Sequence, residues 1–538
     1  EHPEFLVNKL YYDAYKKDMT AGTYPDVRSG LQKLLKDGLL LFNYTGHGGT
    51  TALSDEKVLT QTDINQFTYT HLPVWVTATC DFTRFDDLNT SAGEDVFLNK
   101  SSGGIALFTT VRVAYSRPNF PINDNVIRNL FERNNGRRRT LGEVMQATKN
   151  TLSSVYKLGF CLIGDPAVKM AYPEFGMKVT TVNGQSVDGN SISFKALEKI
   201  TVEGEVLDVS GQLVTDFTGI VNPTVKDSKV TVTCLKNSNK DDSPAFTFTD
   251  YPNTIFIGND SVRNGKFSFT FTVPKDISYS NLQGKMNLYA VDTESGNEAQ
   301  GNFDNFIVGG TSDTAETDTI GPEIRALYLN DTTFVDGGQV NTTPYFVAEL
   351  WDKSGVNITG SSVGHDMMLV IDESTVLSYN LNSYYELLPG EDGTGIVKFP
   401  IPALEPGKHT AEFWVWDILN NSTVRTFTFE VVEGLKPFLF DVIATPGIAR
   451  EQVTFHLMHN RPESRMRVGI MVYDLAGRQL WKHEESGTSG LFENYTVSWD
   501  LTSGGVRMRP GVYIYRAAIS TDNSKDATKA RKFIILGE

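Results

Sequence analysis

The chain has 538 residues, of which 49 are basic and 65 acidic, and its formal net charge is −16. Its 40% hydrophobic and 21% charged residues exclude a wholly disordered protein. The acidic balance repels phosphate backbones, so we expect no nucleic-acid partner. The length predicts three to four domains of roughly 150 residues. No apolar run reaches the roughly 18 residues that a membrane-spanning helix needs.

The first 172 residues alternate helical and strand-like patterns. Continuous apolar runs predict strands buried on both faces at 39–42, 74–78 and 104–108. Helical spacing predicts helices at 5–15, around 31–35 with an end at Gly38, at 62–67, at 92–99, and after the capping-box pattern at Thr140. This alternation indicates an α/β domain with a mostly parallel sheet.

After residue 172 the helical pattern almost disappears. Short alternating runs such as 230–234 and 266–271, separated by Gly, Asn, Asp and Pro, predict β-sandwich modules. The polar, acidic stretch 311–320 predicts a linker. We therefore expect a multidomain chain divided into 1–172, 173–310, the linker, 321–434 and 438–538.

A histidine and a cysteine follow two of the predicted buried strands. His47 lies in a glycine-rich loop after the first, and Cys80 comes shortly after the second. If these strands are neighbours, His47 can generate the Cys80 thiolate and later protonate a leaving amine. The backbone N–H groups of Gly48 and Cys80 would then hold the oxyanion. The alternative is a buried structural thiol beside an ordinary loop histidine; the pairing at matching strand ends favours catalysis.

The same residues resemble the gingipain family of cysteine peptidases, in the caspase-like clan. The motif Asn43-Tyr44-Thr45-Gly46-His47-Gly48 followed by Cys80 carries the likeness, and Ser91-Ala92-Gly93-Glu94 and 103–108 fit it. The segment Leu162-Ile163-Gly164-Asp165-Pro166-Ala167 resembles a narrower branch, the sortases of the bacterial type IX secretion system. The resemblance covers 1–172. It implies an N-terminally truncated, caspase-like α/β catalytic domain followed by β-sandwich (Ig-like) modules.

The last module supports this resemblance independently. It resembles a type IX secretion C-terminal signal domain at 444–447, 473–477, 499–500, 511–513 and 532–535, although the Pro-Asn-Pro opening of many such domains is missing. Both ends of the chain therefore suggest one secretion pathway.

The resemblance implies a cell-surface sortase. Such an enzyme cleaves the C-terminal signal domain from secreted cargo through a thioester and transfers the cargo to an amine on anionic lipopolysaccharide. Cys80 would be the nucleophile and His47 the general acid/base, with Asp81 and Glu94 as weaker candidates for substrate binding. The acidic residue that orients the histidine in this family would precede Glu1. Two alternatives stay open: a secreted gingipain-like endopeptidase that only hydrolyses, and a non-catalytic surface adhesin or assembly subunit with a peptidase-like scaffold.

The resemblance also implies partners and a location. We expect a peripheral protein at the outer-membrane surface, anchored by a barrel protein of the PorV kind and accompanied by attachment subunits such as PorQ and PorZ. Cargo bearing C-terminal signal domains and anionic lipopolysaccharide complete the expected partners. No cofactor and no metal ion is expected.

Weaker signals have simpler interpretations. We expect Cys161 to be a buried free thiol and Cys234 to be structural, because a bridge between them would cross domains. His456 and His459 fall on opposite faces of a strand, which argues against a metal site. The basic cluster Arg133, Arg137, Arg138 and Arg139 suits a solvated loop better than an anion site. Asp81, Asp86 and Asp87 lack regular calcium-loop spacing.

Overall fold

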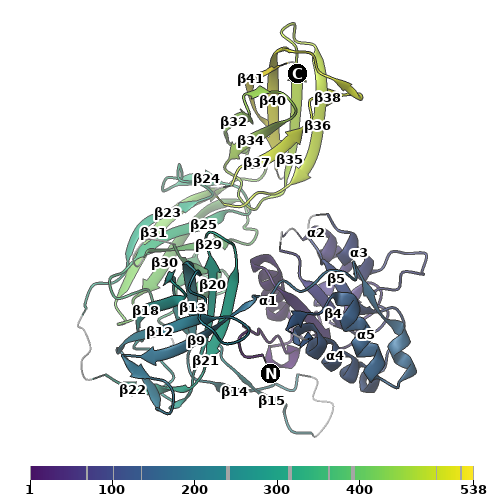
Figure 1. Cartoon of the computed structure of the whole chain (residues 1–538). Helices are drawn as coiled ribbons and strands as arrows, with labels where there is room; N and C mark the ends of the chain where they lie inside the picture. The colour runs from purple at the N-terminus through teal and green to yellow at the C-terminus, as the bar shows by residue number, and fades with distance from the viewer. Residues whose placement is uncertain are drawn as a thin grey trace.

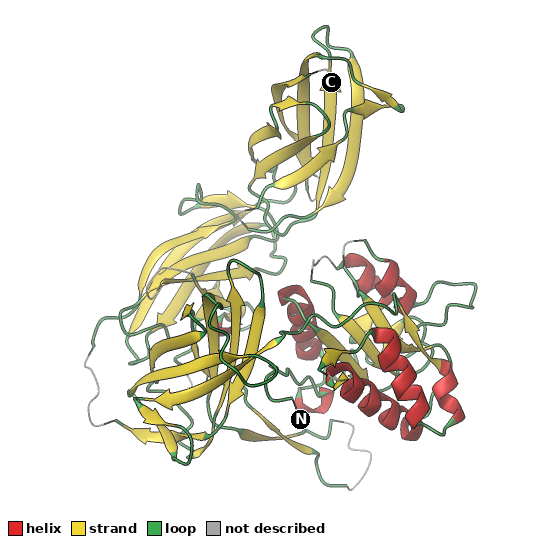
Figure 2. Ribbon diagram, in the orientation of Figure 1, coloured by secondary structure: helices red, strands yellow, loops and turns green. Residues whose placement is uncertain are grey.

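The structure is a computed structural model that describes residues 2–67, 69, 71–100, 102–134, 136–237, 243–312, 318–360, 364–388, 394–491, 493–521 and 524–536. Helices gather in the part formed by the beginning of the chain, and strands form the rest (Figure 1, Figure 2). The helical part lies beside the first strand-rich part, and the C-terminal strands extend away from both (Figure 1). Within the described residues, no helix is both long and apolar enough to cross a membrane.

A four-stranded sheet forms the centre of the α/β part. Its strands are β1 (Leu41–Thr45), β4 (Val74–Ala78), β5 (Ala106–Thr110) and β8 (Phe160–Ile163), in the order β1-β4-β5-β8. The first three are parallel, whereas β8 runs antiparallel to β5. Every residue of β4 and β5 is buried, as expected of strands covered on both faces.

Helices and short hairpins surround this sheet. They are α1 (Pro25–Asp37), α2 (Gln61–Gln66), α3 (Ala92–Leu98), α4 (Ser116–Phe131), α5 (Leu141–Thr151), β2 (Ala52–Leu53) with β3 (Leu59–Thr60), and β6 (Arg133–Asn134) with β7 (Arg137–Arg138). Short 3₁₀ turns cover Tyr12–Ala14 and Val155–Gly159. Apolar clusters on the two sides of the sheet hold these elements in place.

Two sequence-based predictions in this part are wrong. The helix predicted at 5–15 is only the 3₁₀ turn Tyr12–Ala14, because carbonyls of this segment accept hydrogen bonds from Lys285 and Leu235, which follow residue 172. The pattern also missed α4, which contains Pro121 and several asparagines that are poor helix formers. Tertiary contacts thus override local periodicity at both places.

The strands from 175 to 311 form one large sheet, a smaller sheet and a separate hairpin. They are β9 (Phe175–Val182), β10 (Gln185–Ser186), β11 (Ile192–Ala196), β12 (Lys199–Leu207), β13 (Gly219–Lys226), β14 (Val230–Thr233), β15 (Thr247–Asp250), β16 (Thr254–Ile257), β17 (Asp260–Arg263), β18 (Lys266–Thr272), β19 (Leu282–Gln283), β20 (Lys285–Asp292), β21 (Glu298–Phe303) and β22 (Phe306–Thr311). The large sheet has the order β10-β9-β12-β18-β17-β13-β20-β21, with β16 paired to β13. The smaller sheet is β11-β22-β19.

The large sheet closes on itself. β9 pairs antiparallel with β12 and parallel with β21, so the two ends of the strand order meet. A plain sandwich was predicted for 173–310, and this closure departs from it. Alternation of apolar and polar residues fixes which face is buried, but it does not distinguish stacked sheets from a closed one.

The strands from 323 to 431 form two sheets over a shared core. They are β23 (Glu323–Leu329), β24 (Gly338–Val340), β25 (Tyr345–Trp351), β26 (Met368–Ile371), β27 (Ser378–Asn380), β28 (Tyr385–Leu387), β29 (Thr394–Pro400), β30 (Gly407–Trp416) and β31 (Ser422–Val431), with a 3₁₀ turn at Asn382–Tyr384. The sheet orders are β23-β25-β29-β28 and β24-β31-β30-β26-β27. Side chains from both sheets build one cluster that includes Phe346 and Phe413.

The last strands, 439–535, repeat this arrangement. They are β32 (Leu439–Thr445), β33 (Ile448–Ala449), β34 (Val453–His459), β35 (Met466–Tyr473), β36 (Gln479–Gly487), β37 (Tyr495–Trp499), β38 (Thr502–Ser503), β39 (Val506–Arg507), β40 (Gly511–Ser520) and β41 (Ala527–Ile535). Sheets β32-β34-β37 and β33-β41-β40-β35-β36 share a core around Phe455 and Tyr515. Half of the predicted linker, residues 313–317, lies outside the described residues.

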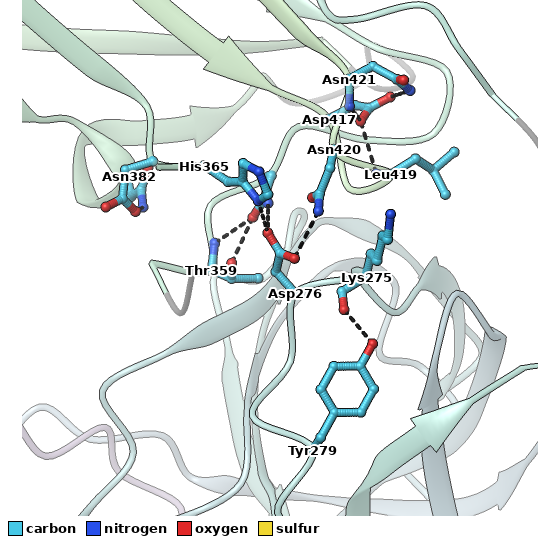
Figure 3. A network of polar contacts seen from close by, with 12 residues as sticks. Lys275, Asp276, Tyr279, Thr359, His365, Asn382, Asp417, Leu419, Asn420 and Asn421 are labelled. Carbon is cyan, nitrogen blue, oxygen red and sulfur yellow. Dashed lines mark hydrogen bonds and ion pairs between the residues drawn. The ribbon is translucent and has the colours of Figure 1, made fainter. Parts of the chain in front are cut away.

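A buried carboxylate joins the first two strand-rich parts (Figure 3). Asp276 follows β18 and accepts hydrogen bonds from the side-chain amide of Asn420 at 3.0 Å and from Nδ1 of His365 at 2.7 Å. The N–H of neighbouring Lys275 donates to the carbonyl of Ile418 at 2.8 Å. These contacts fix the junction through polar groups rather than through a shared apolar core.

Candidate functional site

The sheet brings the two predicted catalytic loops to one edge. β1 and β4 are adjacent and parallel, and Thr45 is in register with Ala78. His47 and Cys80 each follow their strand by the same short distance. The predicted neighbouring strands are therefore confirmed, and both loops lie at the carboxyl edge, where open α/β sheets bind ligands.

The histidine loop is held by its backbone. The hydroxyl of Tyr44 donates to the carbonyl of His47 at 2.6 Å, and the N–H of Ser54 donates to the same oxygen at 2.8 Å. Gly46 makes room for the phenol, because a Cβ on it would lie 2.7 Å from the Tyr44 hydroxyl. The imidazole of His47 is exposed and forms no hydrogen bond with the described part of the chain, so its ring is free to meet a substrate.

The two loops touch at Gly48. A Cβ on Gly48 would stand 2.4 Å from Oγ1 of Thr79, the residue before Cys80. Gly48 pairs with Leu53 in a bridge whose hydrogen bonds come from the flanking residues, namely Gly49 to Ala52 at 3.0 Å and Ser54 to His47 at 2.8 Å. The N–H of Gly48 therefore points away from that bridge. Within the described residues, neither this N–H nor that of Cys80 donates to an acceptor, so both suit an oxyanion hole.

A third loop holds the cysteine. The half-buried thiol of Cys80 donates to the carbonyl of Ala114 at 3.1 Å and accepts from the Ala114 N–H at 3.4 Å. Behind it, the Thr110 hydroxyl donates to the carbonyl of Thr79 at 2.7 Å. Sequence reasoning missed the loop after β5, because contacts made by the backbone of an alanine leave no pattern in the sequence.

The weaker candidates have structural contacts. Glu94 closes the capping box of α3, where its carboxylate accepts from the N–H and the hydroxyl of Ser91 at 2.8 and 2.7 Å. Asp81 has a left-handed backbone with φ +50°, and its N–H donates to the carbonyl of Arg112 at 3.3 Å. A role for either in substrate binding stays a prediction.

The charged groups beside these loops are ion-paired. Arg112 contacts Asp86 at 2.6 Å, and hydrogen bonding to the guanidinium lowers the pKa of that carboxyl. Arg84 lies 3.7 Å from Asp87. Two of the three aspartates noted in the sequence, Asp86 and Asp87, are thus paired with arginines.

The basic cluster is ion-paired as well. Its guanidinium groups form the pairs Arg133–Glu174, Arg137–Glu143, Arg138–Glu174 and Arg139–Glu132. The Arg137 guanidinium, together with the backbone of Thr140, lowers the pKa of Glu143 to about 2. These contacts favour the solvated-loop interpretation over an anion site.

All three cysteines are free thiols. Cys161 lies on β8 opposite Thr109 and is half-exposed, so the prediction that it is buried is wrong. The reason is that β8 is the edge strand of its sheet, with one side open. Cys234 is buried, which raises the pKa of its thiol.

Three carboxylates gather in a place that the sequence spacing did not indicate. Oxygen atoms of Asp318, Asp352 and Asp417 lie within 4.8 Å of one another, and the last two residues are buried. Burial raises the pKa of Asp352 to about 6, despite hydrogen bonds from the backbone N–H groups of Ser354 and Gly355. This acidic group is the described set that could hold a metal ion, and it lies outside the peptidase-like part.

A hollow of about 400 Å³ lies at the junction between the α/β part and the first strands after it. Phe5, Phe131, Tyr172 and Asp208 are among the residues that line it. None of its lining residues belongs to the loops of His47 or Cys80, so this hollow is separate from the candidate site.

Comparison with known proteins agrees with this site. The model of peptidase family C25 matches residues 1–171, which contain all three loops. No protein of curated function matches the chain. Among solved structures, the chain is similar to dimeric latent PorU from Porphyromonas gingivalis, with 38% identity, coverage of 76% of this chain and 39% of that chain, and a TM-score of 0.34.

Two further solved structures are gingipains. The Arg-specific cysteine proteinase gingipain R (RGPB) is 19% identical, with coverage of 52% of this chain and 56% of that chain and a TM-score of 0.26. The complex of Porphyromonas gingivalis RgpB pro- and mature domains is 20% identical, with coverage of 52% and 57% and a TM-score of 0.25. The chain thus spans less than two thirds of each of these proteins. Residues 1–171 thus match the model of peptidase family C25, a family of cysteine peptidases, and this likeness is confined to the α/β part of the chain.

Proposed function

We propose that the chain carries the catalytic site of a cell-surface sortase, which cleaves C-terminal signal domains from secreted cargo and joins the cargo to an amine. The observation that carries this proposal is the meeting of the His47 and Cys80 loops at one edge of a parallel sheet in a family C25 domain. The 38% identity with PorU and the signal-domain motifs of the last module favour the sortase branch.

The first half-reaction forms a thioester. The Cys80 thiolate attacks the carbonyl carbon of the scissile peptide bond, and the carbonyl oxygen takes up the electron pair as an oxyanion. The N–H groups of Gly48 and Cys80 donate to that oxyanion. The intermediate then collapses, the C–N bond breaks, and the imidazolium of His47 protonates the departing amine. The signal domain leaves with a new N-terminus.

The second half-reaction decides between transfer and hydrolysis. Neutral His47 accepts a proton from the incoming nucleophile, which attacks the thioester carbonyl and releases the Cys80 thiolate. An amine produces an amide, whereas water produces a carboxylate. The exposed imidazole and half-buried thiol leave this face open to a bulky acceptor, and we propose that the acceptor is an amine on anionic lipopolysaccharide.

The surroundings of the enzyme belong to the same proposal. The module at 438–538 would dock the protein at the outer-membrane surface on a barrel protein of the PorV kind, with PorQ and PorZ as further partners. The strands between residues 173 and 434 would hold the catalytic part at a set distance from that anchor.

The test compares variants of two cysteines of the same chain, Cys80 and Cys161. Purified protein is incubated with a cargo bearing a C-terminal signal domain and a primary-amine acceptor, and the new cargo C-terminus is weighed by mass spectrometry. Wild type and Cys161→Ala should produce the amide, and Cys80→Ala should produce no product. Processing by Cys80→Ala at the wild-type rate would refute catalysis by this cysteine. A carboxylate product alone, in the presence of acceptor, would refute transfer and leave a hydrolytic peptidase.

A further inference from the structure

A hairpin from the strands that follow the α/β part contacts that part. We define the arm as β14, β15 and the residues 234–237 after β14. Within the described residues, β14 and β15 pair only with each other and join neither the large closed sheet nor the smaller one. Its outer end reaches the segment 9–17 near the beginning of the chain (Figure 1). The position of this strand pair, outside the larger sheets, points to a role for its contact with the segment 9–17.

The contact centres on the carboxylate of Asp13. Its oxygens accept hydrogen bonds from the backbone N–H of Lys236 and of Asn237, each at 2.8 Å, and from the Asn237 side chain at 2.9 Å. The backbone carbonyl of Asp13 accepts from the N–H of Leu235 at 2.7 Å. Asp13 is therefore held by three consecutive residues of the arm.

The same 3₁₀ turn carries Tyr12 toward the histidine loop. The ring of Tyr12 packs against the apolar cluster that contains Tyr44, and the centroids of the two rings lie 6.5 Å apart. The hydroxyl of Tyr44 in turn donates to the carbonyl of His47 at 2.6 Å. Burial raises the pKa of both phenols, which keeps these protons in place at neutral pH.

We infer that the arm is a positioning element for His47, and that it acts through Asp13, Tyr12 and Tyr44. The arm fixes the 3₁₀ turn, the turn packs the Tyr12 ring beside that of Tyr44, and Tyr44 holds the main chain of His47. The module at 173–310 is then part of the catalytic apparatus rather than a spacer. This inference rests on the proposed role of His47.

The interface supplies a matched control. Asn287 of β20 donates to the carbonyls of Pro3 and Glu4 at 2.9 and 3.0 Å, so it also joins the two parts. Pro3 and Glu4 are not part of the proposed connection to Tyr44. Asn287→Ala therefore weakens the same interface without touching the proposed connection.

The first test measures alkylation of Cys80 by iodoacetamide across pH in a Cys161→Ser background. It needs no substrate, and it reports on His47 because a nearby imidazolium promotes the thiolate. Asp13→Ala and Tyr44→Phe should shift the midpoint of this profile to higher pH, whereas Asn287→Ala should leave it unchanged. A profile that none of the three variants moves, in protein that melts like wild type, would refute the inference.

The second test uses turnover of the cargo substrate. Loss of one such hydrogen bond should reduce kcat roughly two- to tenfold, with KM changed by less, in both Asp13→Ala and Tyr44→Phe. If Asp13 acts through Tyr44, the double variant should be no slower than Tyr44→Phe alone. Multiplied losses in the double variant would refute the connection. Unchanged activity of Cys80→Ala would instead refute the proposed function, so the two failures are distinguishable.

Discussion

Gly48 is packed directly against Thr79: a Cβ on Gly48 would lie 2.4 Å from the Thr79 hydroxyl and 3.3 Å from the carbonyl of Ala52. The two loops that carry His47 and Cys80 are thus in van der Waals contact through a residue that has no side chain. This contact places the Gly48 N–H beside the cysteine loop.

Replacing Gly48 tests that contact. Gly48→Ala should push the histidine loop away from Cys80 and lower kcat by about 100-fold or more, a loss typical of a displaced oxyanion donor. The measurement is single-turnover acylation of Cys80. Gly49→Ala is the control, because a Cβ there meets nothing within 4 Å. Equal activity of the two variants would contradict the tight contact.

Glu94 offers a test between a structural and a substrate-binding role. Glu94→Ala should reduce the unfolding free energy by about 1 kcal/mol, because the capping box of α3 is lost, while KM stays unchanged. Glu94→Gln should restore most of that stability, since the amide oxygen can still accept from Ser91. A large rise in KM in both variants, with stability unchanged, would assign Glu94 to the substrate instead.

The sequence predicted the centre of the α/β part well. β4 begins and ends where the apolar run does, and the capping box expected at Thr140 is present before α5. β1 lies later than the predicted run, at Leu41–Thr45, and exposes alternate residues because it is an edge strand, but it is the parallel neighbour of β4 as expected. The placement of His47 and Cys80 at one edge was therefore within reach of the sequence.

The contacts that support the site could not be predicted from the sequence. Ala114 holds the thiol through its backbone, and Tyr44 holds a backbone carbonyl, so neither has a chemical signature in the sequence. The segment 5–15 has helical spacing, yet its polar groups bond to the arm and to Lys285 of β20. Such contacts depend on the meeting of distant segments, which local patterns do not encode.

The environment of His459 predicts that the last module loses stability at acid pH. Burial, with the Arg461 charge nearby, lowers the pKa of His459 from 6.5 to about 4. Its ring contacts the Ser489 hydroxyl at 2.8 Å and accepts from the Arg461 N–H at 3.1 Å, an arrangement that needs the neutral form. A lowered pKa stabilises the fold above about pH 6.5, and this contribution is lost as the pH falls toward 4. The loss is at most roughly 3 kcal/mol.

Calorimetry of the full chain between pH 7 and pH 4 measures this effect. His459→Gln should flatten the pH dependence of one transition. His456→Gln, on the opposite face of β34, should leave that dependence as in wild type. A wild-type slope that His459→Gln does not change would contradict the assignment.

The Asp276 junction predicts coupling between two strand-rich parts (Figure 3). Asp276→Asn removes the charge that holds His365 and Asn420, so we expect a loss of about 1–3 kcal/mol in unfolding free energy and a broader small-angle scattering envelope. The control is Asp372→Asn, whose carboxylate holds His409 at 2.7 Å within a single part. If both variants scatter like wild type, the junction does not depend on this carboxylate.

The pairing of β9 with β21 affects how this sheet can associate with other polypeptides. An open sheet presents its outermost strand as a template on which foreign chains can assemble. In the closed ring β9 instead has a partner on each side, β12 and β21. Along their paired residues, neither β9 nor β21 therefore offers a free backbone edge to an extended foreign segment.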